Sequence, residues 1–291
     1  MEPPIHALTS WLTSSSGSLN LWHQRLGHLH PNAVTQMADD HLITGMDITD
    51  REPIASPCKP CLEDKQMHKV ICKVTSTRAE NVLGHVYTDV CRPLPVASHR
   101  GYRYFVTFID DSSHFASISP IQAKSEVGKL LKVFITWAEL ETGYKVKTLR
   151  FDGGGEYMAQ HVQDWLHKRG IKHEVTTADM PQHNGIAERL NRMLLDKSHA
   201  MLADAKLPKS YWLEALNYTM LLHKLSPSRS TTTTPSEAYT GTKPDVSRLH
   251  IFRCMAHVHV PKQSWDKLSA RSLSCIFLGF FQQCSAFHLV H

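Results

Sequence analysis

The sequence predicts an α/β protein whose core is a mixed five-stranded sheet flanked by helices. Five short segments are rich in β-branched and aromatic residues, and three longer ones repeat apolar residues every three or four positions. Along the chain they follow the order of three strands, then helix, strand, helix, strand and helix, which favours layered packing. The composition agrees, because 42% hydrophobic and 20% charged residues are ordinary for a globular chain of 291 residues.

The individual elements follow from local patterns. We expect the strands of the sheet at residues 85–90, 102–110, 114–121, 145–151 and 171–176. We expect the flanking helices at residues 125–141, 157–169 and 186–205, with Gly143 and Gly170 ending the first two. A further helix is predicted over 211–225 and short strands over 256–260 and 274–278, whereas residues 1 to about 75 look short and irregular.

Several protein classes are excluded or disfavoured by composition. No run of 18 apolar residues exists, so the sequence predicts no membrane-spanning helix, and residues 1–21 lack the pattern of a secretory signal. Seven scattered cysteines do not resemble a disulfide framework and favour a reducing compartment. The formal net charge of +5 permits nucleic-acid binding without demonstrating it.

Three acidic residues stand at suggestive places. Asp89 ends the first predicted strand, Asp152 follows the fourth, and Glu188 lies in the first turn of the helix over 186–205. Carboxylates on neighbouring elements can hold two divalent cations about 3.5–4 Å apart, which activate an attacking oxygen and stabilise the leaving oxygen of a phosphodiester. Taken singly, Asp152 is better explained as a turn residue and Glu188 as a helix-start residue. Taken together, the three favour a metal site.

The three carboxylates lie in distinctive stretches of sequence: Tyr87–Cys91, Leu149–Tyr157 and Pro181–Arg189, with 35 residues between Asp152 and Glu188. These stretches resemble the integrase core of copia-type LTR retrotransposons, and the spacing is that of the D,D-35-E integrases. The resemblance runs from about residue 21 to 279. It implies a ribonuclease-H-like core, Mg²⁺ or Mn²⁺ as cofactor, and DNA strand transfer with Asp89, Asp152 and Glu188 as the catalytic, metal-binding triad.

Four positions near the triad depart from this family pattern. The family usually has Gly, Ser, Asn and Gln where this chain has Arg92, Phe151, Gly153 and His183. None of these changes removes a carboxylate. The larger side chains of Arg92 and Phe151 are expected to lie beside the site, and without an Asn at position 153 we expect Asp152 to be less well oriented.

A second set of residues has the spacing of zinc ligands. His23 and His28 form an H-x4-H pair, and Cys58 and Cys61 form a C-x2-C pair, with 29 residues between His28 and Cys58. The histidines can share one helix face and the two thiolates meet at one point, so that the four complete a tetrahedral Zn²⁺ site. The alternative is surface histidines with an incidental cysteine pair. The set resembles the HHCC domain that precedes the core in copia-type integrases, which favours a structural zinc, with His30 as a possible substitute for His28.

The helix over 186–205 also carries basic side chains. Arg189, Arg192 and Lys197 are candidates for phosphate contacts beside the metals, which are largely independent of DNA sequence. The alternative is a solvated face in which Glu188 and Arg192 form an i,i+4 pair. Lys197 is the preferred candidate, because similar integrases place a lysine there against the ends of their DNA.

The resemblance also predicts the organisation of the chain. We expect a flexible N-terminus (1–18), an HHCC zinc-binding domain (19–65), a linker (66–81), the catalytic core (82–228) and a partial SH3-like, β-rich module (235–291). In that module Arg253 stands where the family commonly has Gly. Neither protease nor reverse transcriptase is present, so we expect a processed portion or, preferably, a fragment of a decayed insertion.

The sequence therefore predicts an integrase, in which a 3′-hydroxyl of the element's DNA attacks a target phosphodiester. Its expected partners are element and target DNA and further copies of itself, and its expected location is the nucleus, after a cytoplasmic particle. The main alternative is a catalytically inactive relic or co-opted DNA-binding protein. A plain nuclease of the ribonuclease H class is disfavoured by the HHCC unit and the 35-residue spacing.

Overall fold

The computed structural model describes residues 16–51, 58–64, 78–152, 154–176, 185–227, 232–260, 271–280 and 286–291. Gly153, His183, most of the basic segment over 65–78 and the serines before Ser16 lie outside the described residues. Among the described helices, none is long and apolar enough to cross a membrane. None of the described cysteines, 58, 61, 91, 254 and 275, forms a disulfide.

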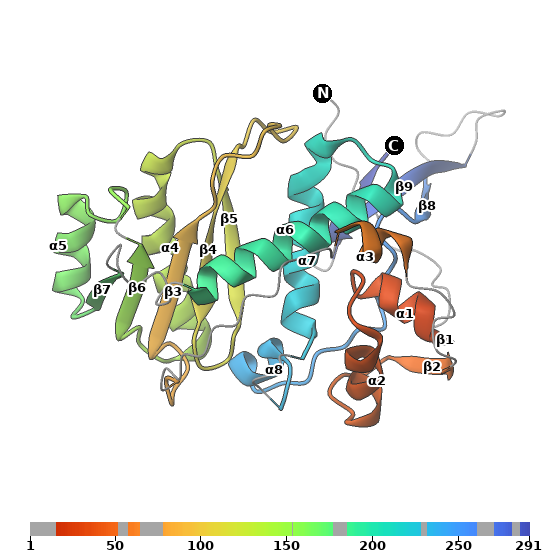
Figure 1. Ribbon diagram of the computed structural model, residues 1–291, viewed down its shortest axis with the longest axis horizontal. Helices are drawn as coiled ribbons and strands as arrows, with labels where there is room; N and C mark the ends of the chain where they lie inside the picture. The colour runs from red at the N-terminus through yellow and green to blue at the C-terminus, as the bar shows by residue number, and fades with distance from the viewer. Residues whose placement is uncertain are drawn as a thin grey trace.

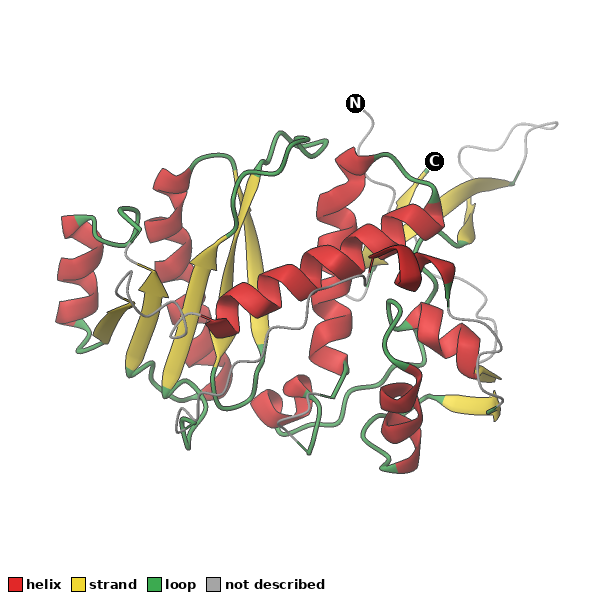
Figure 2. Ribbon diagram, viewed as in Figure 1, coloured by secondary structure: helices red, strands yellow, loops and turns green. Residues whose placement is uncertain are grey.

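The predicted five-stranded mixed sheet is present, with strand order β5-β4-β3-β6-β7 (Figures 1 and 2). Its strands are β3 (His85–Val90), β4 (Tyr104–Asp110), β5 (Ala116–Ile121), β6 (Thr148–Asp152) and β7 (Lys172–Thr176). β3, β4 and β5 form an antiparallel meander, whereas β6 and β7 run parallel to β3. This mixed topology is that of a ribonuclease-H-like core, and the first predicted strand has the observed bounds.

Helices cover both faces of this sheet and divide the core into two clusters. The helices of the core are α4 (Val127–Thr142), α5 (Gln160–Lys168), α6 (Gly185–Ala205) and α7 (Trp212–Leu225). Val86, Leu149 and Phe151 face α4 and α5, whereas Tyr87 and Phe105 face α6 and α7. Successive strand residues point to opposite faces. This alternation decides which side chains of β3 and β6 reach α6.

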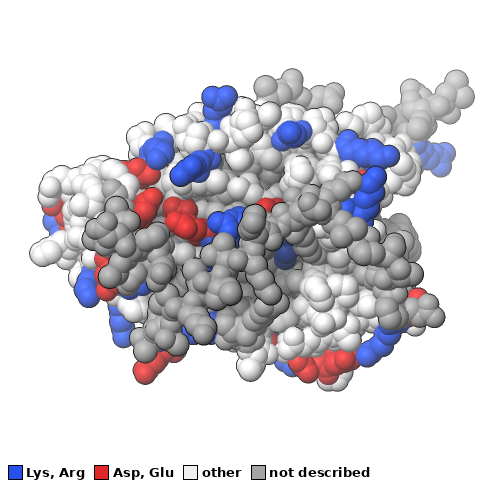
Figure 3. Space-filling model, in the orientation of Figure 1, with Lys and Arg blue, Asp and Glu red and all other residues white. Residues whose placement is uncertain are grey.

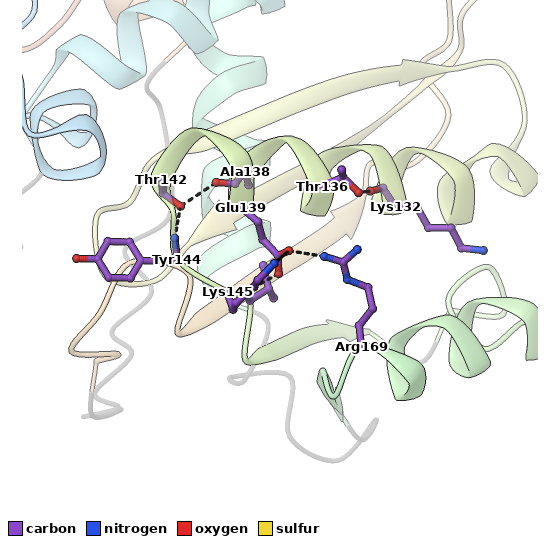
Figure 4. Close-up of polar contacts among 9 residues, drawn as sticks. Lys132, Thr136, Ala138, Glu139, Thr142, Tyr144, Lys145 and Arg169 are labelled. Carbon is purple, nitrogen blue, oxygen red and sulfur yellow. Dashed lines mark hydrogen bonds and ion pairs between the residues drawn. The ribbon is translucent and has the colours of Figure 1, made fainter.

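The ends of α4 are fixed by polar side chains and by a glycine, not by the apolar residues whose periodicity predicts the helix. The 3₁₀ turn η1 (Lys124–Glu126) precedes the helix, and the Glu126 carboxylate accepts hydrogen bonds from the N–H groups of Gln122 and Ala123. At the other end, Gly143 adopts the left-handed conformation with φ 72°. The buried carboxylate of Glu139 holds the following chain (Figure 4).

The N-terminal unit is more regular than the sequence predicts. Instead of an irregular segment, it contains β1 (Ser16–Ser18), α1 (Leu19–Arg25), α2 (Pro31–Asp39), β2 (Asp47–Asp50) and α3 (Lys59–Asp64). The helices are too short to give a long periodic pattern, but their caps are visible in the sequence. The Ser18 hydroxyl accepts from the N–H of Leu21, and Pro31 opens α2.

The C-terminal segment adds a helix and a separate small sheet. After η3 (Lys209–Tyr211) and α7 come α8 (Pro235–Thr240) and an antiparallel sheet, β10-β9-β8, made of Phe287–Val290, Ser272–Phe280 and Met255–His259. The sequence did not predict α8 or β10, which are only six and four residues long. Tyr239 of α8 stacks on Phe115 of the core at 4.0 Å between ring centroids. The sheet packs on α7 through Tyr218, which contacts Phe277.

Candidate metal and nucleic-acid sites

Asp89 and Asp152 lie on neighbouring parallel strands and on the same face of the sheet. In the register of β3 with β6, His85 lies opposite Thr148 and Tyr87 opposite Arg150. Continuing this register by two residues places Asp89 opposite Asp152. Tyr87 faces α6 and Phe151 faces α5, so alternation directs both aspartates toward α6. The carboxyl ends of the two strands therefore present two carboxylates together.

The long helix α6 brings the third carboxylate to this edge. Glu188 lies exposed in the first turn of α6, and the buried Asn191, one turn further on, donates a hydrogen bond from Nδ2 to Oδ2 of Asp89 at 2.8 Å. This contact fixes the start of α6 against β3. Asp152 and Glu188 thus both lie within electrostatic range of Asp89, although Gly153 beside Asp152 lies outside the described residues.

The electrostatics of Asp89 reflect this proximity. Burial, followed by the negative charges of Asp152 and Glu188, raises the pKa of Asp89 from 3.8 to about 6, against hydrogen bonds from Asn191 and from the backbone at Val90. A carboxylate that is held near other carboxylates gains from a nearby cation, because the cation relieves both the repulsion and the incomplete solvation. The site therefore has the charge and the oxygen ligands that suit a divalent metal such as Mg²⁺.

An aromatic pair supports the site from the opposite face of the sheet. Tyr157 is fully buried, stacks on Phe151 with ring centroids 4.7 Å apart, and its hydroxyl lies 2.8 Å from Oγ1 of Thr88. Phe151 thus occupies the core under the site. The expectation that its larger side chain lies beside the carboxylates is wrong, because alternation turns it away from them. Arg92 is exposed in the loop after β3.

The basic candidates on α6 divide into two groups. Arg189 and Arg192 are exposed, and Arg192 follows Glu188 by one turn on the same face. Lys197 is nine residues beyond Glu188, which places it about 180° around the helix axis. It is half-buried, and with burial its charge helps to lower the pKa of His223 on α7 to about 3. The structure therefore brings Arg192, but not Lys197, to the side of Glu188.

The surface around the carboxylates carries both signs of charge. On the face seen in Figure 3, acidic side chains gather over the ends of β3 and β6, and basic side chains lie around and above them. Such an arrangement suits a metal-dependent reaction on a polyanion, since the metals would screen the acidic centre and the surrounding cations would meet phosphates.

The four predicted zinc ligands meet in the N-terminal unit. Their ligand atoms all lie within 4.8 Å of one another. Nε2 of His23 and Nδ1 of His28 are 3.3 Å apart, Cys58 Sγ is 3.2 Å from His28 Nδ1, and Cys61 Sγ is 3.6 Å from His23 Nε2. A tetrahedral zinc with ordinary bond lengths requires about 3.3 Å between two nitrogens and about 3.6 Å between nitrogen and sulfur. The residues present therefore fit a zinc ion.

The orientation of the first histidine also suits metal binding. Nδ1 of His23 donates to the carbonyl oxygen of Leu29 at 2.7 Å, which leaves the Nε2 lone pair directed at the cluster. His30, the alternative ligand, instead caps α2, where its Nδ1 accepts from the N–H of Asn32 at 3.2 Å. The structure therefore places His28, and not His30, in the cluster.

Sequence reasoning missed several residues that support the two sites. Asn191 and Tyr157 contact the strand that carries Asp89, and Asp204 lies beside His28. The spacing of Asn191, three residues after Glu188 on the same helix, was a usable signal. The contacts of Tyr157 and Asp204 join segments that are far apart in sequence, which no local pattern reports.

Comparison with known families divides the chain into three matching segments. Residues 2–66 match the GAG-pre-integrase domain, residues 79–181 the integrase core domain, and residues 254–291 the retroviral polymerase SH3-like domain. These segments contain, respectively, the His/Cys cluster, the two aspartates with all five strands of the main sheet, and the small C-terminal sheet.

Similar proteins come from plant transposons. The retrovirus-related Pol polyprotein from transposon TNT 1-94 of Nicotiana tabacum is 40% identical over 264 residues, which are 90% of this chain and 20% of that protein. The corresponding polyprotein from transposon RE1 of Arabidopsis thaliana is 27% identical over 279 residues, covering 96% of this chain and 19% of that protein. This chain spans about a fifth of the length of these relatives.

Among solved structures, the HTLV-2 integrase catalytic core domain in complex with magnesium (trimeric form) matches with a TM-score of 0.43 and 19% identity, covering 56% of this chain and 99% of that one. The family assignment rests instead on the three matching domains and on the transposon relatives. The chain is thus similar to the integrase region of retrovirus-related Pol polyproteins from transposons, and the predicted resemblance to a retrotransposon integrase is confirmed.

Proposed function

We propose that this chain catalyses divalent-metal-dependent DNA strand transfer, joining a 3′-hydroxyl end of element DNA to a target phosphodiester. The observation that supports the proposal is the effect of the Asp152 and Glu188 charges on Asp89, since these carboxylates come from two neighbouring strands and one helix. Three carboxylates held on separate rigid elements are the oxygen-rich, preorganised environment that such chemistry requires.

In this proposal Asp89, Asp152 and Glu188 hold Mg²⁺ or Mn²⁺, which supplies activation of the attacking oxygen and charge stabilisation of the leaving oxygen. The 3′-hydroxyl attacks phosphorus in line, one P–O bond forms, and the P–O3′ bond of the target breaks. The number of phosphodiester bonds is conserved, so no external energy source is needed. Asn191 keeps one oxygen of Asp89 oriented through its hydrogen bond.

The proposed partners follow from the charges around the site. Arg189 and Arg192, both exposed at the start of α6, are placed to contact DNA phosphates. Lys197 is also proposed to contact DNA, although it lies on the opposite side of the α6 axis from Glu188. Joining two DNA ends to one target also requires more than one active site, so we propose a homo-oligomer, acting in the nucleus.

The second proposed cofactor is structural. His23, His28, Cys58 and Cys61 would bind one Zn²⁺, with all four protein ligands closing the coordination sphere, so that no position remains for substrate. A structural zinc stabilises a small unit that buries little apolar surface by itself. We therefore assign the zinc to folding and the acidic site to chemistry.

The experiment that separates chemistry from binding compares Glu188→Gln with Glu141→Gln, an exposed glutamate on α4. With labelled duplex DNA, supercoiled plasmid target and Mg²⁺ or Mn²⁺, Glu188→Gln should lose joined products at least hundred-fold while DNA affinity changes little. Glu141→Gln should join DNA like the wild type. Equal joining by Glu188→Gln would remove this residue from the mechanism.

A second candidate is a catalytically inactive, DNA-binding relic, and one observation favours it. Arg253 adopts the left-handed conformation with φ 69°, at a position where the family commonly has Gly. A residue with a side chain destabilises that conformation by about 1–2 kcal/mol relative to glycine. Replacement of a glycine there is the kind of substitution that a decaying copy accumulates. For this candidate, zinc and DNA binding would persist without joined products.

A further inference from the structure

The proposed zinc site packs directly against α6, the helix that carries Glu188, which is called the catalytic helix below. Gly27, in the turn between His23 and His28, has φ 63°, and a Cβ there would lie 2.6 Å from Cδ1 of Leu222 on α7 and 3.6 Å from Sδ of Met201 on α6. The helix α3, which carries Cys61, also contacts α6. The cysteine half of the metal site therefore contacts α6, which passes α3 in Figure 1, and the turn between the two histidines packs against α7 and α6.

The second histidine has one ring nitrogen facing the cluster and one facing α6. Nδ1 of His28 lies 3.2 Å from Cys58 Sγ, whereas Nε2 lies 4.0 Å from Oδ2 of Asp204. His28 is buried and Asp204 is 37% exposed, in the last turn of α6. The distance is within ion-pair range and longer than a hydrogen bond.

We propose that Asp204 is the carboxylate partner of His28, so that the catalytic helix supplies the outer contact of the zinc site. This inference rests on the zinc site proposed above. A carboxylate that accepts a hydrogen bond from the distal nitrogen of a metal-bound histidine fixes the ring and increases its basicity. His23 has the equivalent contact from within its own unit, the carbonyl of Leu29. Asp204 is thus a positioning residue that acts through His28.

The consequence is a mechanical link between the two metal sites. Glu188 and Asp204 lie at opposite ends of α6, sixteen residues apart, which is about 24 Å at 1.5 Å per residue. Zinc binding fixes the C-terminal end of the helix through His28, while Asn191 and Asp89 fix its start. Release of zinc is therefore expected to loosen the last turns of the helix that carries the catalytic glutamate.

The test measures zinc affinity of the full chain by competition with a chromophoric chelator. Asp204→Asn should bind Zn²⁺ roughly 10- to 100-fold more weakly, the usual cost of losing an outer partner. Asp204→Glu, whose longer side chain can reach Nε2, should restore the affinity. Asp40→Asn, an exposed aspartate at the C-cap of α2, is the matched control and should bind as the wild type does.

Two further readouts keep the proposal falsifiable if stability changes. The visible spectrum of the Co²⁺-loaded protein reports the metal environment directly and should shift in Asp204→Asn but not in Asp40→Asn. Amide hydrogen exchange over 198–205 should accelerate on zinc removal. Wild-type affinity and spectrum in Asp204→Asn would overturn the link, whereas a wild-type chain that binds no zinc, or a Cys58→Ser variant that binds it equally well, would overturn the zinc site itself.

Discussion

At the scale of single residues, the site places Asp89 where ionisation opposes folding. Its carboxylate is partly buried next to Asp152 and accepts hydrogen bonds from Asn191 and from the backbone at Val90. The Oδ1 atom of Asn191 is itself buried without a hydrogen-bond partner among the described residues. A bound metal ion would reverse the sign of the local charge and favour the ionised carboxylate. Without that ion, the ionised carboxylate of Asp89 lowers the stability of the fold.

The first prediction concerns Asp89→Asn in zinc-containing buffer without Mg²⁺ or Mn²⁺. Because folding raises the pKa of Asp89 from 3.8 to about 6, its contribution to stability is full below 3.8 and is lost as pH rises through 6. At pH 7.5 the variant should therefore be more stable, by up to roughly 3 kcal/mol. Urea unfolding at pH 4 and 7.5 measures this difference, and equal stability of both proteins at pH 7.5 would refute it.

The second prediction concerns Arg253, at a φ of 69°. Arg253→Gly should raise the free energy of unfolding by roughly 0.5–1 kcal/mol, because relief of the left-handed conformation exceeds the added entropy of glycine. Arg253→Ala removes the same charge but keeps a Cβ, so it serves as the control and should give no gain. Chemical denaturation of the wild type and the two variants measures the free energy of unfolding of each. If both variants gained equally, the gain would come from loss of the Arg253 charge and not from relief of the left-handed conformation.

At the scale of elements, the sequence predicted best where periodicity is long. The bounds of β3 agree with the prediction, and α6 begins one residue earlier than expected. The helix predicted from Tyr157 begins at Gln160, because Tyr157 is instead buried as a ring partner of Phe151. In the N-terminal unit, capping residues rather than periodicity define the helices, so a pattern search described that segment as irregular.

A third prediction belongs to the junction between α4 and β6. Glu139 is 5% exposed and accepts hydrogen bonds from Lys145 Nζ at 2.9 Å and the N–H of Val146 at 3.1 Å, and it also pairs with Arg169 (Figure 4). Burial acts to raise the pKa of Glu139, but these partners outweigh it and the pKa is lowered. Its stabilisation is therefore present at neutral pH and is lost as pH falls through that lowered value.

Glu139→Gln should accordingly cost roughly 1–3 kcal/mol at pH 7, the range for losing hydrogen bonds to a charged group. Glu141→Gln, on the same helix and exposed, should change stability by less than about 0.5 kcal/mol. Guanidinium unfolding at pH 7 and pH 3 provides the comparison. A cost for Glu139→Gln that is undiminished at pH 3 would contradict the role of the charge.

At the scale of the whole molecule, one hydrophobic cluster joins segments that the sequence separates. Trp22 of the N-terminal unit, Leu216 of α7 and Phe277 of β9 belong to the same buried cluster. A parallel bridge between Thr44 and Asp245 also connects the first unit to the chain after α8. The spacing of the histidines and cysteines predicted that these four residues cluster, and the order of strands and helices predicted the main sheet. Neither could predict this docking, which depends on contacts about 200 residues apart.

The fourth prediction follows from that shared cluster. Zinc chelation, or Cys58→Ser, should lower the melting temperature of the full chain and not only unfold the N-terminal unit, because exposing Trp22 opens the cluster that α7 shares. Cys254→Ser, at a cysteine outside the metal cluster, is the control and should keep its response to zinc. A core transition that is indifferent to zinc in calorimetry would show that the units unfold independently.

Strand transfer by the zinc-loaded chain tests the proposed chemistry itself. Labelled duplex DNA carrying a retrotransposon terminal sequence is incubated with supercoiled plasmid and Mg²⁺ or Mn²⁺. Joined products should form with the wild type and with Asp164→Asn, an exposed aspartate on α5, and should vanish with Asp152→Asn. A folded, zinc-loaded wild type that binds this DNA and joins none of it would contradict the proposed chemistry and leave the DNA-binding relic as the function.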